Sequence, residues 1–231
     1  MEYEPFPFQT LDLSNELIEC RRCPRLVAWR EEVGQVKRRA YLKEDYWAKP
    51  VPGFGTADAR IMVLGLAPGA HGSNRTGRMF TGDASGDFLF PALNRAGFAS
   101  QPLATGASDG LTLNDLYITS VCHCVPPANK PTGEEIRNCA HWVEQELKAL
   151  TRLQGIVLLG KIGLDGLLAL EPFKEIKKSE IKFGHGAFYE LGDGLPWLLC
   201  SYHPSRQNTQ TGRLTVEMFD AIWDEVNFEL R

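Results

Sequence analysis

The spacing of the cysteines is the first feature of this sequence that predicts chemistry. Cys20 and Cys23 form a C-x-x-C pair, which lets two thiolates reach one metal, and Cys122, Cys124 and Cys139 offer the second half of a four-cysteine site. A redox-active C-x-x-C is disfavoured, because such a pair stands between a strand and a helix whereas this one follows a helical segment. The spacing leaves open the choice between Cys122 and Cys124, and between zinc and an iron–sulfur cluster.

Two of the cysteines also have a purely structural interpretation. Cys139 falls in the apolar stripe of a predicted helix, and Cys200 lies inside the apolar run PWLLCSY. Free cysteine is often simply a small buried side chain. We therefore interpret Cys200 as a core residue and keep Cys139 as a candidate ligand.

A long polar loop, Ala67–Asp83, is the second chemical feature. It follows the short apolar run Ile61–Leu66, which predicts a buried strand. Its glycines let the backbone approach a ligand, and its polar side chains can converge there. With Ala84 it spans roughly eighteen residues, far more than a usual strand-to-helix connection, which favours a functional loop. It matches neither a phosphate loop nor a dinucleotide fingerprint, and a helix capped by Ser85 is expected to follow.

Strands and helices alternate along the rest of the chain. This order predicts an α/β domain with a mainly parallel sheet and helices on both faces. The predicted strands are Ile61–Leu66, Asp115–Val121, Gly155–Gly160, Gly186–Leu191 and Pro196–Tyr202. The predicted helices are Leu11–Arg30 with a break at Cys23-Pro24, one opened by a Thr132/Glu135 capping box, Ile162–Leu170 and Leu214–Val226.

Three polar loops follow buried strands in this scheme: Ala67–Asp83, Cys122–Pro131 and His203–Arg213. Ligands of open α/β sheets bind beyond the carboxyl ends of the strands. We therefore expect the three loops to share one rim and to form the site.

Composition limits the class of protein. A chain of 231 residues with 43% hydrophobic residues predicts a single domain over residues 1–231. The acidic start MEYEPFPFQ lacks the features of a signal peptide and no long apolar span occurs, so we expect a cytoplasmic protein with reduced thiols and no membrane contact. The formal charge of −4 argues against a generally basic nucleic-acid coat. The basic segment Arg21–Lys43 is interpreted equally as a solvated face or as a phosphate contact.

The motifs GLAPGAHGSNRTGRMFTGD and HPS resemble the two signatures of the uracil-DNA glycosylase superfamily, and the long first motif is similar to the fifth class, UDGb. The resemblance runs from about Cys20 to about Leu214. It implies a three-layer α/β/α sandwich around a four-stranded, mainly parallel sheet. It also implies an N-terminal segment that binds a [4Fe–4S] cluster through Cys20, Cys23, Cys124 and Cys139, which leaves Cys122 and Cys200 as spare thiols.

The resemblance further implies a DNA repair enzyme that flips uracil, and also hypoxanthine and related deaminated bases, out of DNA and hydrolyses the N-glycosidic bond. The catalytic residues are then Asp83, His203 and Asn129. The base contacts are Gly65, Leu66, Ala67, the ring of Phe80, Asn129 and His203, and the DNA contacts are Arg75, Arg78, Pro204, Ser205 and Arg206. Core, turn-forming and structural roles are the respective alternatives for Phe80, Asn129 and His203.

Two positions depart from the pattern of related classes. Leu66 stands where those classes place a polar residue that orients water, and Ser120 replaces a base-reading Asn. Both agree with the fifth class and with a less discriminating pocket.

We expect the protein to be a monomer. The main rival function is a non-enzymatic zinc or iron–sulfur nucleic-acid-binding protein. An α/β hydrolase is disfavoured because no G-x-S-x-G is present.

Overall fold

A computed structural model describes residues 9–192 and 194–231 of the chain, so the acidic start predicted to lack a signal lies largely outside the described residues. The strands form one sheet in the order β1-β3-β2-β4-β6-β5. They are β1 (Phe54–Gly55), β2 (Ile61–Gly65), β3 (Leu116–Ser120), β4 (Gly155–Leu159), β5 (Phe188–Tyr189) and β6 (Trp197–Ser201). The four central strands are parallel, which confirms the predicted sheet, and the two-residue β1 and β5 add antiparallel edges.

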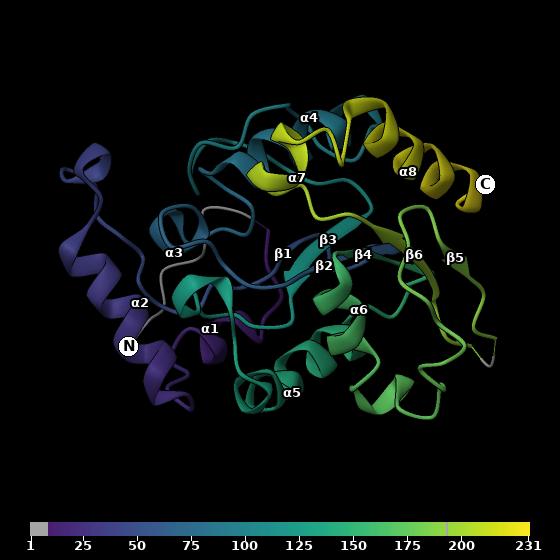
Figure 1. Cartoon of the computed structure of the whole chain (residues 1–231), viewed down its shortest axis with the longest axis horizontal. Helices are drawn as coiled ribbons and strands as arrows, with labels where there is room; N and C mark the ends of the chain where they lie inside the picture. Colours follow the sequence, from purple (N-terminus) through teal and green to yellow (C-terminus); the bar gives the residue numbers. More distant parts are fainter. Residues whose placement is uncertain (1–8, 193) are drawn as a thin grey trace.

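Helices cover both faces of the sheet, with α4 and α8 on one side and α5 and α6 on the other (Figure 1). The helices are α1 (Ser14–Leu17), α2 (Pro24–Val36), α3 (Ser73–Thr76), α4 (Ala84–Arg95), α5 (Gly133–Ala149), α6 (Lys161–Leu167), α7 (Arg206–Gln210) and α8 (Val216–Glu229). Short 3-10 turns occur at Arg39–Tyr41, Pro127–Asn129 and Glu171–Phe173. The predicted three-layer α/β/α fold is confirmed, and none of the described helices is long and apolar enough to cross a membrane.

Burial on both faces explains why the strand sequences are continuously apolar. All five residues of β2, β3 and β4 are buried. One core lies between the sheet and α4 and α8, around Phe219 and Trp223, and the other lies under α5 and α6, around Val143 and Leu167. Each large apolar side chain buried in this way contributes about 1.5–3 kcal/mol. The two cores hold the loops at the carboxyl ends of the strands.

The helix boundaries follow local chemistry, with some corrections. Cys23 precedes α2 and Pro24 occupies its first turn, as predicted, but α2 runs on to Val36 and the earlier helix is a single turn. The capping box at the start of α5 is confirmed, with Thr132 and Glu135 each accepting from the other's backbone N–H. The predicted Ser85 cap of α4 is wrong, because Asp83 is the cap.

Candidate active site and cysteine cavity

A cavity of about 660 Å³ opens beyond the carboxyl ends of the parallel strands. Its lining comes from all three predicted loops and from the start of α6: Leu66, Ala67, Gly69, Ser73, Met79, Phe80, Asp83, Ala84, Ser85, Asn129, Ile162, His203, Ser205, Arg206 and Gln207. The prediction that the loops share one rim is confirmed. A cavity of this size accommodates a nucleobase and part of its sugar.

Phe80 forms an aromatic wall of the cavity with His203. The two rings stack, with centroids 5.9 Å apart and planes inclined by 29°. Phe80 takes a positive φ of 52°, and its ring lies so close to Gly65 that a Cβ there would stand 2.9 Å from Cζ. Only glycine at the end of β2 admits the ring. The chain thus accepts backbone strain at Phe80 to place an aromatic ring in the pocket.

His203 follows β6 and lines the pocket beside Phe80. Desolvation lowers the pKa of its imidazole to about 4. The side chain is therefore neutral at physiological pH and can donate one N–H. Within the described parts of the chain no group hydrogen-bonds to its ring nitrogens, whereas its carbonyl accepts from Asn208 Nδ2 at 2.8 Å. The backbone is fixed and the ring remains available to a ligand.

The two carboxylate oxygens of Asp83 have different surroundings. Its Oδ1 accepts from the backbone N–H groups of Ser85 at 3.0 Å and Gly86 at 3.2 Å, which caps α4. Its Oδ2 lies against Gly69 and Gly72, where a Cβ would stand 2.8 and 2.1 Å from it. Desolvation raises the pKa of Asp83, opposed in part by the two backbone hydrogen bonds. One oxygen is used by the helix, and no described group donates to the other.

The remaining predicted base contacts are only partly brought together. Leu66, Ala67 and Asn129 line the cavity, whereas Gly65 supports Phe80 from behind. Asn129 is exposed with a φ of 55°, and no side-chain hydrogen bond holds its amide among the described residues.

Arg75 and Arg78 are both buried, which argues against their predicted DNA contacts. Arg78 is fully buried and donates to both carboxylate oxygens of Asp109, at 2.8 and 2.7 Å. This pair lowers the pKa of Asp109 to about 2, although desolvation, the largest effect, works in the opposite direction. Arg75 is 8% exposed and binds Glu44 and the carbonyls of His71 and Gly82. Both arginines are bonded within the loop Ala67–Asp83 and help to hold its shape.

The loop after His203 begins α7. Ser205 accepts from the backbone N–H of Asn208 at 3.4 Å, so its hydroxyl caps this short helix. Arg206 is exposed at the mouth of the cavity, and Pro204 is buried beneath it. Of the five predicted DNA contacts, Ser205 and Arg206 lie where DNA can approach the pocket.

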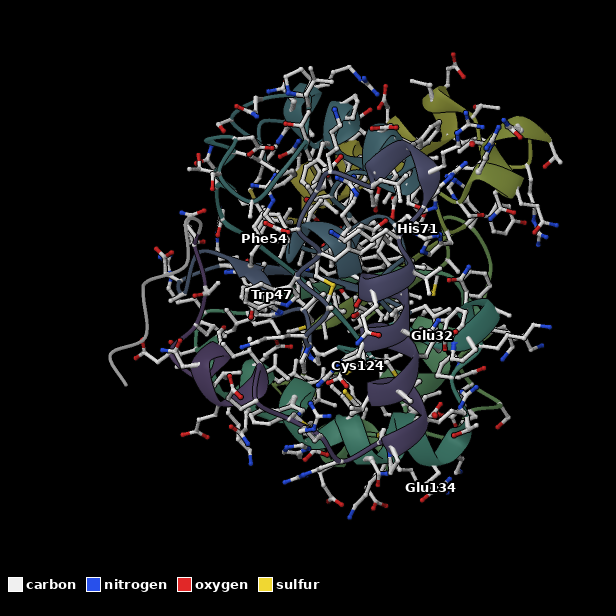
Figure 2. All side chains as sticks on the ribbon, turned by 90° about the vertical axis from the view of Figure 1, so that its left-hand side faces the viewer. Glu32, Trp47, Phe54, His71, Cys124 and Glu134 are labelled. Carbon is white, nitrogen blue, oxygen red and sulfur yellow. The ribbon has the colours of Figure 1, made fainter. Side chains whose placement is uncertain are left out.

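A second site lies between α2 and α5. Cys20, Cys23, Cys124 and Cys139 line a single cavity, and Figure 2 shows Cys124 beside α2. Three of the four sulfurs accept hydrogen bonds, at 3.0 Å from Arg30 to Cys124, at 3.3 Å from the His123 N–H to Cys139 and at 3.8 Å from Asn138 to Cys23. As placed, the described His, Cys, Asp and Glu side chains form no group of three that would hold a single metal ion.

Of the two spare thiols, Cys122 is buried, and its interaction with the Cys139 thiol is the largest cause of the raised pKa of Cys139. Cys200 is buried in β6. Burial raises the pKa of Cys124 to about 12, and the charge and hydrogen bond of Arg30 oppose this shift in part.

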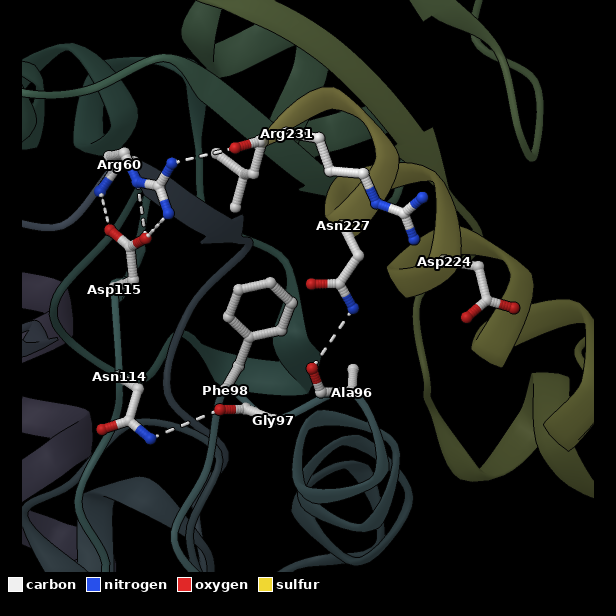
Figure 3. Close-up of a pocket in the computed structure, with 10 residues that line it drawn as sticks. Arg60, Ala96, Gly97, Phe98, Asn114, Asp115, Asp224, Asn227 and Arg231 are labelled. Atoms are coloured by element: carbon white, nitrogen blue, oxygen red, sulfur yellow. Dashed lines mark hydrogen bonds and ion pairs between the residues drawn. The ribbon is translucent and has the colours of Figure 1, made fainter.

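Another hollow of about 660 Å³ lies at the opposite, amino end of the strands (Figure 3). Its polar groups bind one another: Arg60 pairs with Asp115 and donates to the carbonyl of Leu230 at 3.1 Å, and Asn227 donates to Ala96 at 3.2 Å. Open α/β sheets bind ligands at the carboxyl ends of their strands. This hollow is therefore not the candidate active site.

The sequence analysis missed several of these residues. Gly69, Ser73, Met79, Ile162 and Gln207 line the pocket. Ile162 directly follows the loop after β4, so the rule that placed the other loops at the rim could have found it. Asp109 and Arg30 carried no local signal, because their partners are distant in sequence.

Comparison with known proteins agrees with this geometry. The profile described as "Uracil DNA glycosylase superfamily" matches residues 52–227. A "Type-5 uracil-DNA glycosylase" of Thermus thermophilus is 57% identical over 203 residues, covering 88% of this chain and 90% of the relative. One of Mycobacterium bovis is 49% identical over 213 residues, covering 91% and 78%. A "Type-4 uracil-DNA glycosylase" of Archaeoglobus fulgidus is 30% identical over 198 residues, covering 84% and 80%. The chain belongs to the uracil DNA glycosylase superfamily, in its type-5 class.

Proposed function

We propose that this protein is a monofunctional DNA glycosylase that removes uracil, and also hypoxanthine and related deaminated bases, and leaves an abasic site. The observation that carries the proposal is the pocket in which Asp83, His203 and the ring of Phe80 meet, at the carboxyl ends of the strands. A glycosylase needs an aromatic surface for the extruded base, a donor for the departing base and negative charge for the cationic sugar.

Each of these residues has one task in the reaction. Phe80 stacks on the base. His203, neutral because of its lowered pKa, donates a hydrogen bond to uracil O2 as the C1′–N1 bond breaks and its electron pair passes to N1. Asp83 Oδ2 stabilises the cationic sugar and orients the water whose oxygen bonds to C1′, and the carboxylate can accept the proton that this water loses.

The substrate range follows from what the pocket lacks as well as from what it holds. Ser120 is buried and donates to the carbonyl of Cys122 at 2.8 Å, so its hydroxyl is not available to read a base. Leu66 offers no polar side chain, and Asn129 stands at the exposed edge of the cavity. A pocket with one exposed amide on the base edge discriminates weakly between uracil and hypoxanthine.

Cys20, Cys23, Cys124 and Cys139 are proposed to hold a [4Fe–4S] cluster. The support is their common cavity and the hydrogen-bond donors around three of the four sulfurs. When bound, the cluster supplies a covalent link between the N-terminal segment and α5. The protein's residues in the pocket carry out the reaction without it.

DNA binding is proposed to involve Arg206 and Ser205 at the mouth of the pocket, with Pro204 supporting them. The protein is further proposed to be a single domain with an N-terminal iron–sulfur-binding segment, and to act as a monomer in the cytoplasm. Light scattering of the purified protein, alone and with DNA, tests whether it is a monomer.

Release of uracil from a labelled oligonucleotide, detected by alkaline cleavage at the abasic site, tests the function. A matched thymine oligonucleotide is the control, and an inosine oligonucleotide tests the wider range. Iron-loaded protein that binds the uracil duplex without releasing the base would refute the enzyme and leave a nucleic-acid-binding protein.

A further inference from the structure

Arg30 is a buried cation beside the four-cysteine cavity. It stands seven residues after Cys23, two turns along α2, and is 2% exposed. Its Nη1 donates to the carbonyl of Cys20 at 3.2 Å and to Cys124 Sγ at 3.0 Å. Its Nε is buried and has no hydrogen-bond partner among the described residues.

No described carboxylate lies within ion-pair distance of Arg30, although the pKa of Glu31, lowered chiefly by its hydrogen bond with Arg21, is also lowered slightly by the charge of Arg30. Its neighbours on the same segment have acidic partners at the surface, since Arg21 pairs with Glu31 at 2.5 Å and Arg25 with Glu135 at 2.7 Å. Arg30 forms no ion pair with any described carboxylate, although it is the most buried of the three. A buried guanidinium without an anion is strongly unfavourable. Among the described residues, the acceptors of its side-chain hydrogen bonds are the carbonyl of Cys20 and Cys124 Sγ.

We propose that Arg30 is the buried counter-charge of the cysteine-bound cluster, and that it both retains the cluster and raises its reduction potential. This inference rests on the proposed [4Fe–4S] cluster. Four thiolates give such a cluster a net negative charge, and a fixed positive charge at hydrogen-bond distance from Cys124 in a poorly solvated site stabilises the more reduced state. Arg30 is thus a positioning residue for the cluster rather than a catalytic one.

The backbone of the same residue is hydrogen-bonded to the loop Ala67–Asp83, part of which lines the candidate pocket. Asn74, in the loop that lines the base pocket, donates from Nδ2 to the carbonyl of Arg30 at 3.3 Å. A substitution that changes only the side chain leaves this hydrogen bond in place. Effects on the cluster can therefore be separated from effects on the pocket.

The test compares four variants of the full chain with the native protein. Arg30→Met removes charge and donor, Arg30→Gln removes the charge but keeps a donor, and Arg30→Lys keeps the charge. Arg22→Met is the matched control, because Arg22 also lines the cavity but is exposed to solvent, where its charge is screened. Iron and sulfide per chain, the rate of cluster loss to a chelator and the midpoint potential from a mediated redox titration are measured for each.

The midpoint potential is expected to shift to more negative values in Arg30→Gln and Arg30→Met and to stay near the native value in Arg30→Lys. Arg22→Met should shift it less than Arg30→Met. The two uncharged variants can also fold, as judged by circular dichroism, but lose the cluster while Arg30→Lys keeps it. This result supports the role of Arg30 as counter-charge equally well.

Equal potentials and equal cluster loss in all proteins would overturn the role of Arg30, as would loss of the cluster from Arg30→Lys together with the others. A native protein that binds no iron after anaerobic reconstitution would instead overturn the cluster itself. The two failures are therefore distinguishable.

Discussion

Replacing Asp83 by Asn separates the charge of this side chain from its shape. Asp83 Oδ1 accepts from Ser85 and Gly86 and caps α4, and the amide oxygen of Asn can accept the same two hydrogen bonds. Asn and Asp are equivalent helix caps, so the substitution removes the carboxylate and preserves the cap. Asp83→Ala removes both, at an additional cost of about 0.5–2 kcal/mol of stability.

The expected effects on rate and on stability have opposite signs. Loss of the carboxylate should slow single-turnover base release roughly tenfold to a thousandfold, or about 1.4–4 kcal/mol. Desolvation raises the folded-state pKa of Asp83, so the stability associated with its neutral form is complete below the unfolded pKa and is lost as the pH rises through the folded pKa. At neutral pH Asp83→Asn should therefore be at least as stable as the native protein, and this advantage should disappear as the pH is lowered towards about 4.

Single-turnover release of uracil and thermal unfolding are measured on the same preparations, with Asp83→Ala as the control for the cap. His203→Ala should also slow release with little change in DNA affinity, because its donor acts in the transition state. The reasoning is refuted when Asp83→Asn keeps the full rate of base release. It is also refuted when the loss of rate is matched by a loss of folding stability, because the slower release would then reflect damage to the fold. In the first case main-chain groups near Leu66 would have to place the water.

Three other predictions follow from the paired and exposed side chains. Asp109→Asn removes the carboxylate partner of buried Arg78, so the free energy of unfolding should fall by about 3–5 kcal/mol, measured by denaturant titration; an unchanged value would show that this ion pair does not stabilise the fold. Arg206→Ala should weaken duplex binding and reduce its salt slope by about 1 in fluorescence anisotropy, with the rate at saturating DNA retained; a slower rate at saturation would place Arg206 in the chemistry. Cys124→Ser should lose iron whereas Cys200→Ala keeps it, and equal iron contents would show that the ligand assignment is wrong.

The sequence alone determined the elements of the fold and the place of the site. The apolar runs of β2, β3 and β4 are continuous because both faces of a central parallel strand are buried, and a continuous run is readable without tertiary information. The capping box at Thr132 and Glu135 is equally local. The rule that ligands bind at the carboxyl ends of parallel strands then predicted that three loops distant in sequence lie at one rim of the sheet.

Only the tertiary structure decided what individual polar side chains do. Arg78 and Arg206 have the same side chain, but one is buried against Asp109 and the other faces solvent, and nothing within a few residues distinguishes them. Ser85 and Asp83 both fit a helix cap, and the backbone geometry gave the role to Asp83.

In the sequence, Arg30 is one of several charges in a basic segment. In the structure, α2 packs against Cys124 and its Arg30 donates to the Cys124 sulfur. The charge state and accessibility of a polar group depend on partners that are distant in sequence. Periodicity and spacing record the backbone and the core, whereas these partners are fixed only when the chain is folded.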